Sequence, residues 1–242
     1  MTALPTHMTD RWRHRNDPAP GEDTLYWHVL MGGCPKVVEL AREARDRLAQ
    51  FSGLHMTPLE RLHLTTLAAG PASAFTGRQL NRMTEIAAGL LADIAPITVT
   101  LGCILYHPQA IMLDVSPAGA LTPIRNAAAR ATRLASEPEV RIHDSAWIPH
   151  ITICYSTADQ PAAPIIAALG EHLPQRNVEI TGLSLVIQHG PERNWDWSTL
   201  ATIELVEKGR NLTTNRAANA GTILSNGQPQ SGPETQTSPE AG

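Results

Sequence analysis

LHLTTLAAG at residues 62–70 and WIPHITICYS at residues 147–156 are the two stretches that decide the fold of this 242-residue chain. Both are rich in apolar and β-branched residues, a composition typical of strands. Each contains the pattern His-x-Thr, which begins at His63 in the first stretch and at His150 in the second. Side chains alternate between the two faces of a strand, so the His and the Thr of each pattern lie on one face.

Short apolar runs alternate with helical patterns on both sides of these stretches. Apolar residues at helical spacing predict four helices, with Thr76 as the N-cap of one and Pro123 in the first turn of another. The predicted strands are 24–31, 62–70, 97–106, 110–117, 147–156, 177–188 and 197–206. The predicted helices are 35–51, 76–94, 123–137 and 161–173.

The order of these elements contains a repeat. A strand that begins near Leu25 is followed by a helix and then by the strand of His63, and the same order runs from Ile111 to His150. The spacing from the first residue to the histidine is 38 residues in one half and 39 in the other. The repeat predicts an α+β fold of two pseudo-repeated lobes, with two antiparallel-rich sheets lining a central cleft and helices outside.

Composition separates the two ends of the chain from its middle. Residues 1–22 are polar and show no apolar periodicity, and residues 208–242 are rich in Gly, Pro, Ser, Thr, Asn and Gln. Such segments bury too little apolar surface to offset chain entropy, so both are predicted to be disordered. The folded domain is predicted at 23–207, with lobes at about 24–106 and 110–206.

Charge and cysteine usage narrow the class of protein. Apolar residues make up 42% of the chain, and the formal net charge of −4 argues against a strongly basic nucleic-acid coat protein. Three cysteines without metal-ligand spacing indicate reduced thiols. The start of the chain has no apolar signal region, and no run of 18 apolar residues occurs. We therefore expect a cytoplasmic monomer with no membrane segment.

The two His-x-Thr patterns supply the groups that opening a phosphodiester requires. If their strands lie side by side, His63 and His150 provide two imidazoles that titrate near neutral pH, and Thr65 and Thr152 provide two hydroxyls. A neutral imidazole can take a proton from the attacking oxygen, and a protonated one can give a proton to the leaving oxygen. The hydroxyls can donate to the non-bridging phosphate oxygens. Such a site requires no metal or other cofactor, and none is expected.

The paired patterns resemble those of the 2H phosphoesterase superfamily, especially its branch of 2′-5′ RNA ligase-like or RNA 2′,3′-cyclic phosphodiesterase proteins. In that family each lobe contributes a strand with the order His, apolar, Thr or Ser, apolar. The pattern that begins at His150 matches this order fully, whereas Thr66 replaces the last apolar residue of the first pattern. The resemblance covers residues 24–206 and leaves both ends of the chain outside it.

The resemblance implies a bilobal fold and metal-independent opening of 2′,3′-cyclic phosphates on RNA ends or nucleotides. His63 and His150 would be the general acid and base, in an order left open, and Thr65 and Thr152 would bind the phosphate. The alternatives are 2′,5′ RNA ligation, hydrolysis of other small cyclic or 2′,5′-linked nucleotides, and a catalytically weak RNA- or nucleotide-binding module. The expected partners are RNA ends or small nucleotides with a cyclic or 2′,5′ phosphodiester.

Four nearby residues are weaker candidates for the same cleft. Arg61 shares the strand parity of His63 and could contact a second phosphate, although a solvated Arg is equally expected. His28 could line the cleft, and Trp195 and Trp197 could stack on a base. For these three residues, ordinary packing is the preferred interpretation.

Overall fold

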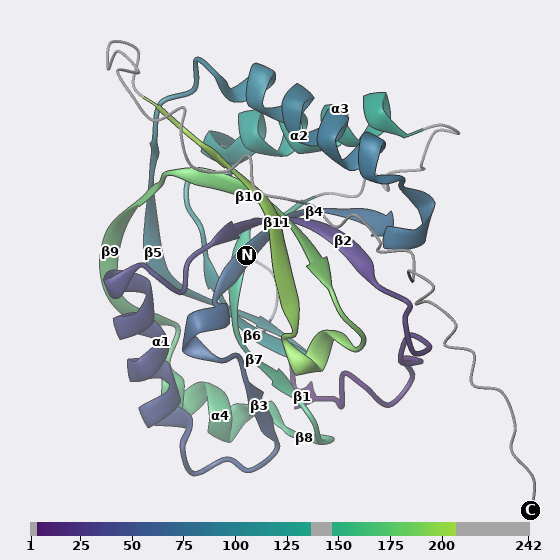
Figure 1. Cartoon of the computed structure of the whole chain (residues 1–242). Helices are drawn as coiled ribbons and strands as arrows, with labels where there is room; N and C mark the ends of the chain where they lie inside the picture. The colour runs from purple at the N-terminus through teal and green to yellow at the C-terminus, as the bar shows by residue number, and fades with distance from the viewer. Residues whose placement is uncertain (1–3, 137–146, 207–242) are drawn as a thin grey trace, which may run out of the picture. The chain divides into compact units, whose positions relative to one another are not determined.

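The computed structural model describes residues 4–136 and 147–206, and the predicted tail at 208–242 lies outside them (Figure 1). The strands are β1 (His7–Met8), β2 (Thr24–Leu30), β3 (Leu54–Met56), β4 (His63–Pro71), β5 (Ile97–His107), β6 (Ala110–Asp114), β7 (His150–Ser156), β8 (Gln160–Pro161), β9 (His172–Ile180), β10 (Gly182–Gln188) and β11 (Trp197–Glu204). The α-helices are α1 (Pro35–Leu48), α2 (Gly77–Leu91), α3 (Thr122–Ala135) and α4 (Ala162–Leu169). Short 3₁₀ turns are η1 (Leu59–Arg61), η2 (Ala72–Ala74), η3 (Ala118–Leu121) and η4 (Glu192–Asn194).

The main sheet within the described residues has two halves that meet in its middle. One half has the strand order β11-β10-β2-β4, the other has the order β7-β6-β5-β9, and β3 also pairs with β7. All of these pairs are antiparallel. The halves join where β4 and β7 pair through Leu64 and Ile151. The prediction of a mixed α and β fold with antiparallel sheets is confirmed.

The two halves do not coincide with the predicted lobe ranges 24–106 and 110–206. β5 lies in the first range but pairs with β6 and β9, whereas β10 and β11 lie in the second range but extend the sheet from β2. Element order in a sequence indicates which strands exist. The choice of partner, however, depends on contacts between edges far apart in the chain. Each half of the sheet is therefore completed by strands from the other range.

Two pairs of helices bury their apolar faces in one core. α2 packs against α3, and α3 against β4, whereas α1 packs against α4, β7 and β9. Figure 1 shows the two pairs over different parts of the sheet. Small buried residues on α3, among them Ala128 and Ala131, allow α2 to approach closely. No helix among residues 4–136 and 147–206 has the length and apolar character that crossing a membrane requires.

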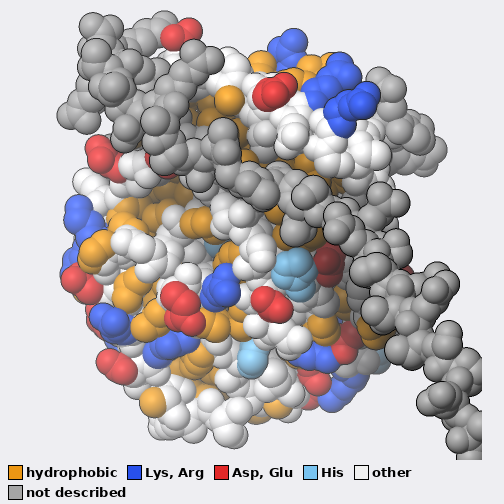
Figure 2. Space-filling model, viewed as in Figure 1, with side chains coloured by type: hydrophobic (Ala, Val, Ile, Leu, Met, Phe, Trp, Pro, Cys, Tyr) orange, Lys and Arg blue, Asp and Glu red, His pale blue; other side chains and the backbone are white. Residues whose placement is uncertain are grey.

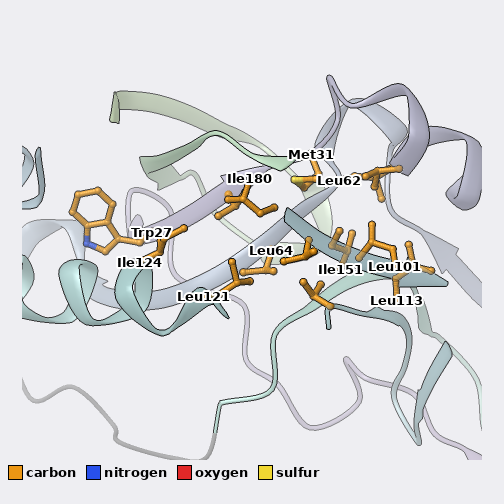
Figure 3. Close-up of a cluster of buried hydrophobic side chains, with 14 of the residues drawn as sticks. Trp27, Met31, Leu62, Leu64, Leu101, Leu113, Leu121, Ile124, Ile151 and Ile180 are labelled. Carbon is orange, nitrogen blue, oxygen red and sulfur yellow. The ribbon is translucent and has the colours of Figure 1, made fainter. Parts of the chain in front are cut away.

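The core lies between these helices and one face of the sheet. Trp27 of β2, Leu64 of β4 and Ile151 of β7 are buried in it, and Figure 3 shows them with Leu121 and Ile124. A second, smaller cluster contains buried Ala110, Tyr155, Val186, Trp195 and Trp197, with Trp12, Tyr26 and Met112 packed against it. Because neighbouring residues of β2 belong to different clusters, the second cluster lies on the opposite face of the sheet.

The prediction that residues 1–22 are disordered is wrong for residues 4–22. β1 pairs with β8, and Met8 is fully buried in the main core. Farther along, the backbone N–H of Arg11 donates to the carbonyl of Ser156 at 2.9 Å. Backbone hydrogen bonds and one buried methionine therefore order a segment whose polar composition gives no sign of its partners.

The end of the helix predicted at 161–173 is the beginning of a strand instead. α4 ends at Leu169, and Gly170 follows with a φ of 80°, a conformation that favours glycine. The hydroxyl of Tyr106 donates to the carbonyl of Gly170 at 2.6 Å and fixes this turn. The chain then continues into β9, which pairs with β5.

The predicted N-cap of α2 is confirmed and provides a test of local stability. The hydroxyl of Thr76 accepts from the backbone N–H of Gln79 at 3.3 Å, and the Gln79 side chain accepts from the N–H of Thr76 at 2.8 Å. Replacing Thr76 with Ala should lower the free energy of unfolding by about 0.5–2 kcal/mol in urea titrations. Thr84→Ala, inside the same helix, is the control and should cause no such loss, because Ala is the better helix former. Equal stability of the two variants would contradict the capping role.

Candidate active site

The two His-x-Thr patterns lie on neighbouring strands, at the junction of the two halves of the sheet. β4 begins at His63 and β7 begins at His150. Leu64 pairs with Ile151, and both are buried in the main core. The residues that flank this pair therefore lie on the opposite face of the sheet, the face of the smaller aromatic cluster.

This register brings the four predicted site residues together. It sets His63 beside Thr152 and Thr65 beside His150. The charge of His150 acts on His63, so the two imidazoles lie near each other. Thr152 is 7% exposed, and the other three side chains are half-buried. One face of the sheet thus carries two imidazoles and two hydroxyls.

The two histidines have the same hydrogen bond to the backbone. Nδ1 of His63 lies 2.7 Å from the carbonyl oxygen of Arg61, and Nδ1 of His150 lies 2.7 Å from that of Ile148. A carbonyl oxygen can only accept, so each Nδ1 carries a proton and donates it. Each Nε2 remains available to accept or deliver a proton, which is the state that acid–base chemistry requires.

The surroundings of His63 are aromatic. Its ring centroid lies 4.2 Å from that of His28 and 4.9 Å from that of Trp197. Burial is the main cause that lowers the pKa of His63, and the nearby imidazole of His150 lowers it further. The hydrogen bond to the Arg61 carbonyl and the charge of Glu192 act in the opposite direction. The net effect favours a neutral imidazole at His63.

A polar network borders the site beside the N-terminal segment. The hydroxyl of Tyr155 donates to the carboxylate of Glu192 at 3.2 Å and also interacts with the hydroxyl of Thr152. Arg11 donates to the same carboxylate at 3.0 and 3.2 Å, and its guanidinium carbon lies 4.1 Å from the centroid of the Tyr155 ring. Arg11 therefore offsets the charge of Glu192.

The weaker candidates are mainly engaged in packing. Trp195 and Trp197 are only 5% and 7% exposed and belong to the smaller cluster, which confirms the packing interpretation. Arg61 donates to the carbonyl of Trp197 at 3.1 Å, and its guanidinium carbon lies 4.9 Å from that ring. Thr66 faces the core, where its hydroxyl donates to the carbonyl of Trp27 at 2.9 Å. This hydrogen bond explains how a threonine can replace an apolar residue there.

Sequence reasoning missed Tyr155, Glu192 and Arg11. Strict alternation from Thr152 places Tyr155 on the core face. The pairing of β6 with β7 shifts its register between Thr152 and Cys154, and this bulge turns Tyr155 to the site face. No residue pattern marks the bulge, and Arg11 lies in the segment predicted to be disordered.

A pocket adjoins the site between the N-terminal segment and η4. Its volume is about 230 Å³, and its lining includes Trp12, Arg15, Tyr26 and Glu192. The ring of Tyr26 stacks on that of His28 at 5.3 Å, which brings the pocket close to the histidines. Within the described part of the chain, no group of three or more His, Cys, Asp or Glu side chains could hold a metal ion.

Comparison with known proteins places this arrangement in a family. No curated protein matches the sequence significantly. TT0787 of Thermus thermophilus is 20% identical with a TM-score of 0.58, covering 76% of this chain and 99% of its own. Apo LigT of E. coli is 14% identical with a TM-score of 0.57, covering 77% of this chain and 99% of its own. At these identities the likeness shows the fold alone. The 2′-5′ RNA ligase superfamily model matches residues 34–192, more than half of the chain and both His-x-Thr patterns, so the chain belongs to this superfamily of 2H phosphoesterases.

Proposed function

We propose that the chain is a metal-independent phosphodiesterase that opens 2′,3′-cyclic phosphates of RNA ends or nucleotides. The observation that carries the proposal is the register about Leu64 and Ile151, which gathers both His-x-Thr patterns on one face. Two imidazoles whose Nε2 atoms have no hydrogen-bond partner among the described residues can supply both the base and the acid of the reaction. Membership of the superfamily supports chemistry of the phosphoesterase or RNA ligase type.

The two histidines divide the proton transfers between them. Neutral His63 accepts a proton at Nε2 from water while the water oxygen bonds to phosphorus. The bond from phosphorus to one ribose oxygen breaks, and protonated His150 gives its Nε2 proton to that oxygen. Thr65 and Thr152 donate hydrogen bonds to the non-bridging oxygens, where negative charge grows. The product is a phosphomonoester beside a free ribose hydroxyl. We assign the base to His63 because its enclosure favours the neutral form.

The surroundings of the site favour small nucleotides or RNA ends over long RNA. The formal net charge is −4, and Figure 2 shows acidic and basic side chains interspersed on the face it presents. Long RNA draws much of its affinity from neutralised phosphates, which such a surface provides poorly. The pocket beside Tyr26 is large enough to hold part of a nucleoside. LigT of E. coli, which shares the fold, has been crystallised with 3′-AMP.

Ligation is a second candidate function, favoured by the description of the matched superfamily. Joining a 5′-hydroxyl to a 2′,3′-cyclic phosphate makes the same bond changes with that hydroxyl in place of water: His63 accepts the proton of the 5′-hydroxyl as its oxygen bonds to phosphorus, and His150 gives a proton to the ribose 3′-oxygen as its bond to phosphorus breaks. RNA that carries both kinds of end should then yield a 2′,5′-linked product. Assays that resolve the product isomers separate hydrolysis from ligation. Binding of cyclic nucleotides without turnover would instead indicate a nucleotide-binding module.

The threonine hydroxyls provide a direct test of the proposal. Thr65→Val and Thr152→Val keep the shape of the side chain and remove one donor to the phosphate. Each should lower kcat/KM for 2′,3′-cyclic nucleotides about 10- to 10²-fold, which corresponds to a hydrogen bond to a charged group. Thr66→Val on the same strand is the matched control, because Thr66 faces the core and should affect stability alone. EDTA should leave all rates unchanged. Equal losses in Thr66→Val and Thr65→Val would contradict phosphate binding by Thr65.

A further inference from the structure

A cluster of aromatic rings lies next to His63. Tyr26 and His28 of β2 stack at 5.3 Å with an interplanar angle of 17°, and His28 lies 4.2 Å from His63 with an angle of 39°. Trp197 of β11 completes this cluster in a T-shaped arrangement, with its centroid 4.9 Å from that of His63 and 5.7 Å from that of His28. One imidazole of the site is thus walled by rings from two other strands.

The register of β2 explains why His28 is at this place. His28 pairs with Thr65 on β4 and with Ser184 on β10, so it lies in the middle of the sheet. Alternation along β2 turns Trp27 to the core and His28 to the face of the site. His28 is only 4% exposed.

His28 makes ring contacts with Tyr26, His63 and Trp197. Nδ1 of His28 is buried and has no hydrogen-bond partner among the described residues. A buried nitrogen without a partner costs stability, so hydrogen bonding by Nδ1 does not explain the position of this side chain. What His28 provides is an aromatic face against His63.

We propose that His28 is a positioning residue, whose ring fixes the imidazole of His63 and keeps water from one of its faces. The proposal rests on the proposed function in that it assigns His28 a part in preparing the base. His150 differs from His63 in this respect. Its Nδ1 has the same kind of hydrogen bond to a backbone carbonyl, but its ring contacts no aromatic ring among the described residues. The ring wall therefore distinguishes the two histidines of the site.

Electrostatics are consistent with this role. Burial lowers the pKa of His28 well below its ordinary value, and the neighbouring His63 lowers it further. A neutral His28 encloses His63 without adding a charge. Tyr26 lies on β2 like His28, and the other charged and titratable groups near these rings come from other elements: His150 from β7, Glu192 from η4, Arg61 from η1, and Arg11 and Arg15 from the N-terminal segment.

Two substitutions separate a ring wall from other roles of His28. His28→Phe keeps an aromatic face and removes the nitrogens, whereas His28→Ala opens the space to water. In His28→Ala, hydration should raise the pKa of His63 toward the ordinary histidine value of about 6.5. In His28→Phe, the pKa of His63 should stay at or below that of the wild type. The acidic limb of the kcat–pH profile should therefore move to higher pH in His28→Ala. That variant should also lose up to about 10²-fold in kcat, because its base is misplaced.

The measurement is an NMR titration of the His63 imidazole in the full chain, assigned with a His63→Ala variant. His55→Ala is the matched control, because His55 also stacks on an aromatic ring, at 5.9 Å from Trp195, but does not touch His63. An unchanged His63 titration in His28→Ala would overturn the proposal, as would an equal shift in His28→Phe. Because the titration needs no substrate, it distinguishes failure of this role from failure of the proposed activity.

Discussion

Replacing His63 or His150 with Ala should slow the chemical step on 2′,3′-cyclic nucleotides by about 10²–10⁴-fold, the usual contribution of one positioned acid or base. Each histidine is oriented by its hydrogen bond to a backbone carbonyl, at 2.7 Å in both cases, and each lies opposite a threonine of the neighbouring strand. The double variant should lose far less than the product of the two single effects, because the base and the acid act as a unit. Single-turnover kinetics measure the step directly.

The controls must show that the loss of rate in these variants comes from a slower chemical step and not from unfolding of the protein. His172→Ala is the control, because His172 is exposed at the start of β9. It should retain wild-type rates, and all variants should be compared at equal folded fractions. Wild-type turnover in the double variant would contradict acid–base catalysis by this pair. Activity that disappeared with a chelator and returned with a divalent ion would contradict the metal-independent mechanism.

The local part of the site could be predicted because it depends only on strand alternation. The His-x-Thr pattern fixes which side chains share a face, and a buried Leu64 beside a buried Ile151 is what that alternation requires. The same reasoning correctly turns Thr66 toward the core. Strand and helix positions follow from periodicity for the same reason, because they are properties of neighbouring residues.

The features that were not predicted depend on contacts distant in sequence. The pairing of β10 with β2 joins residues more than 150 positions apart, and because β11 pairs with β10, it brings Trp197 to the imidazole of His63. The bulge at Ile153 reverses the alternation that would place Tyr155 in the core. Arg11 reaches Glu192 from a polar segment whose order depends on one buried methionine and on backbone pairing. None of these contacts leaves a local pattern.

Replacing Trp27 with Ala should lower the free energy of unfolding by about 3–5 kcal/mol, the range for truncating a fully buried aromatic residue. Trp27 has no exposed surface, and Figure 3 shows it beside the helix that carries Ile124. Its Nε1–H donates to the hydroxyl of Thr132 at 3.0 Å, so one side chain joins β2 to α3 by packing and by a hydrogen bond. Thr132 keeps its own donation to the carbonyl of Ala128 at 2.8 Å, so most of the loss should come from the cavity.

Urea unfolding monitored by far-UV circular dichroism measures this loss. Leu200→Ala on β11 is the control, because Leu200 is 44% exposed and its truncation should change stability by no more than about 0.5 kcal/mol. The free energy of unfolding of Trp27→Phe should lie between those of Trp27→Ala and Leu200→Ala, since Phe retains much of the ring volume but loses the hydrogen bond to Thr132. Trp27 and His28 are adjacent on β2 but face opposite sides of the sheet, so folded Trp27→Phe should keep the wild-type titration of His63. A Trp27→Ala variant no less stable than Leu200→Ala would show that β2 is held mainly by its ladder of strand pairs rather than by the core beneath it.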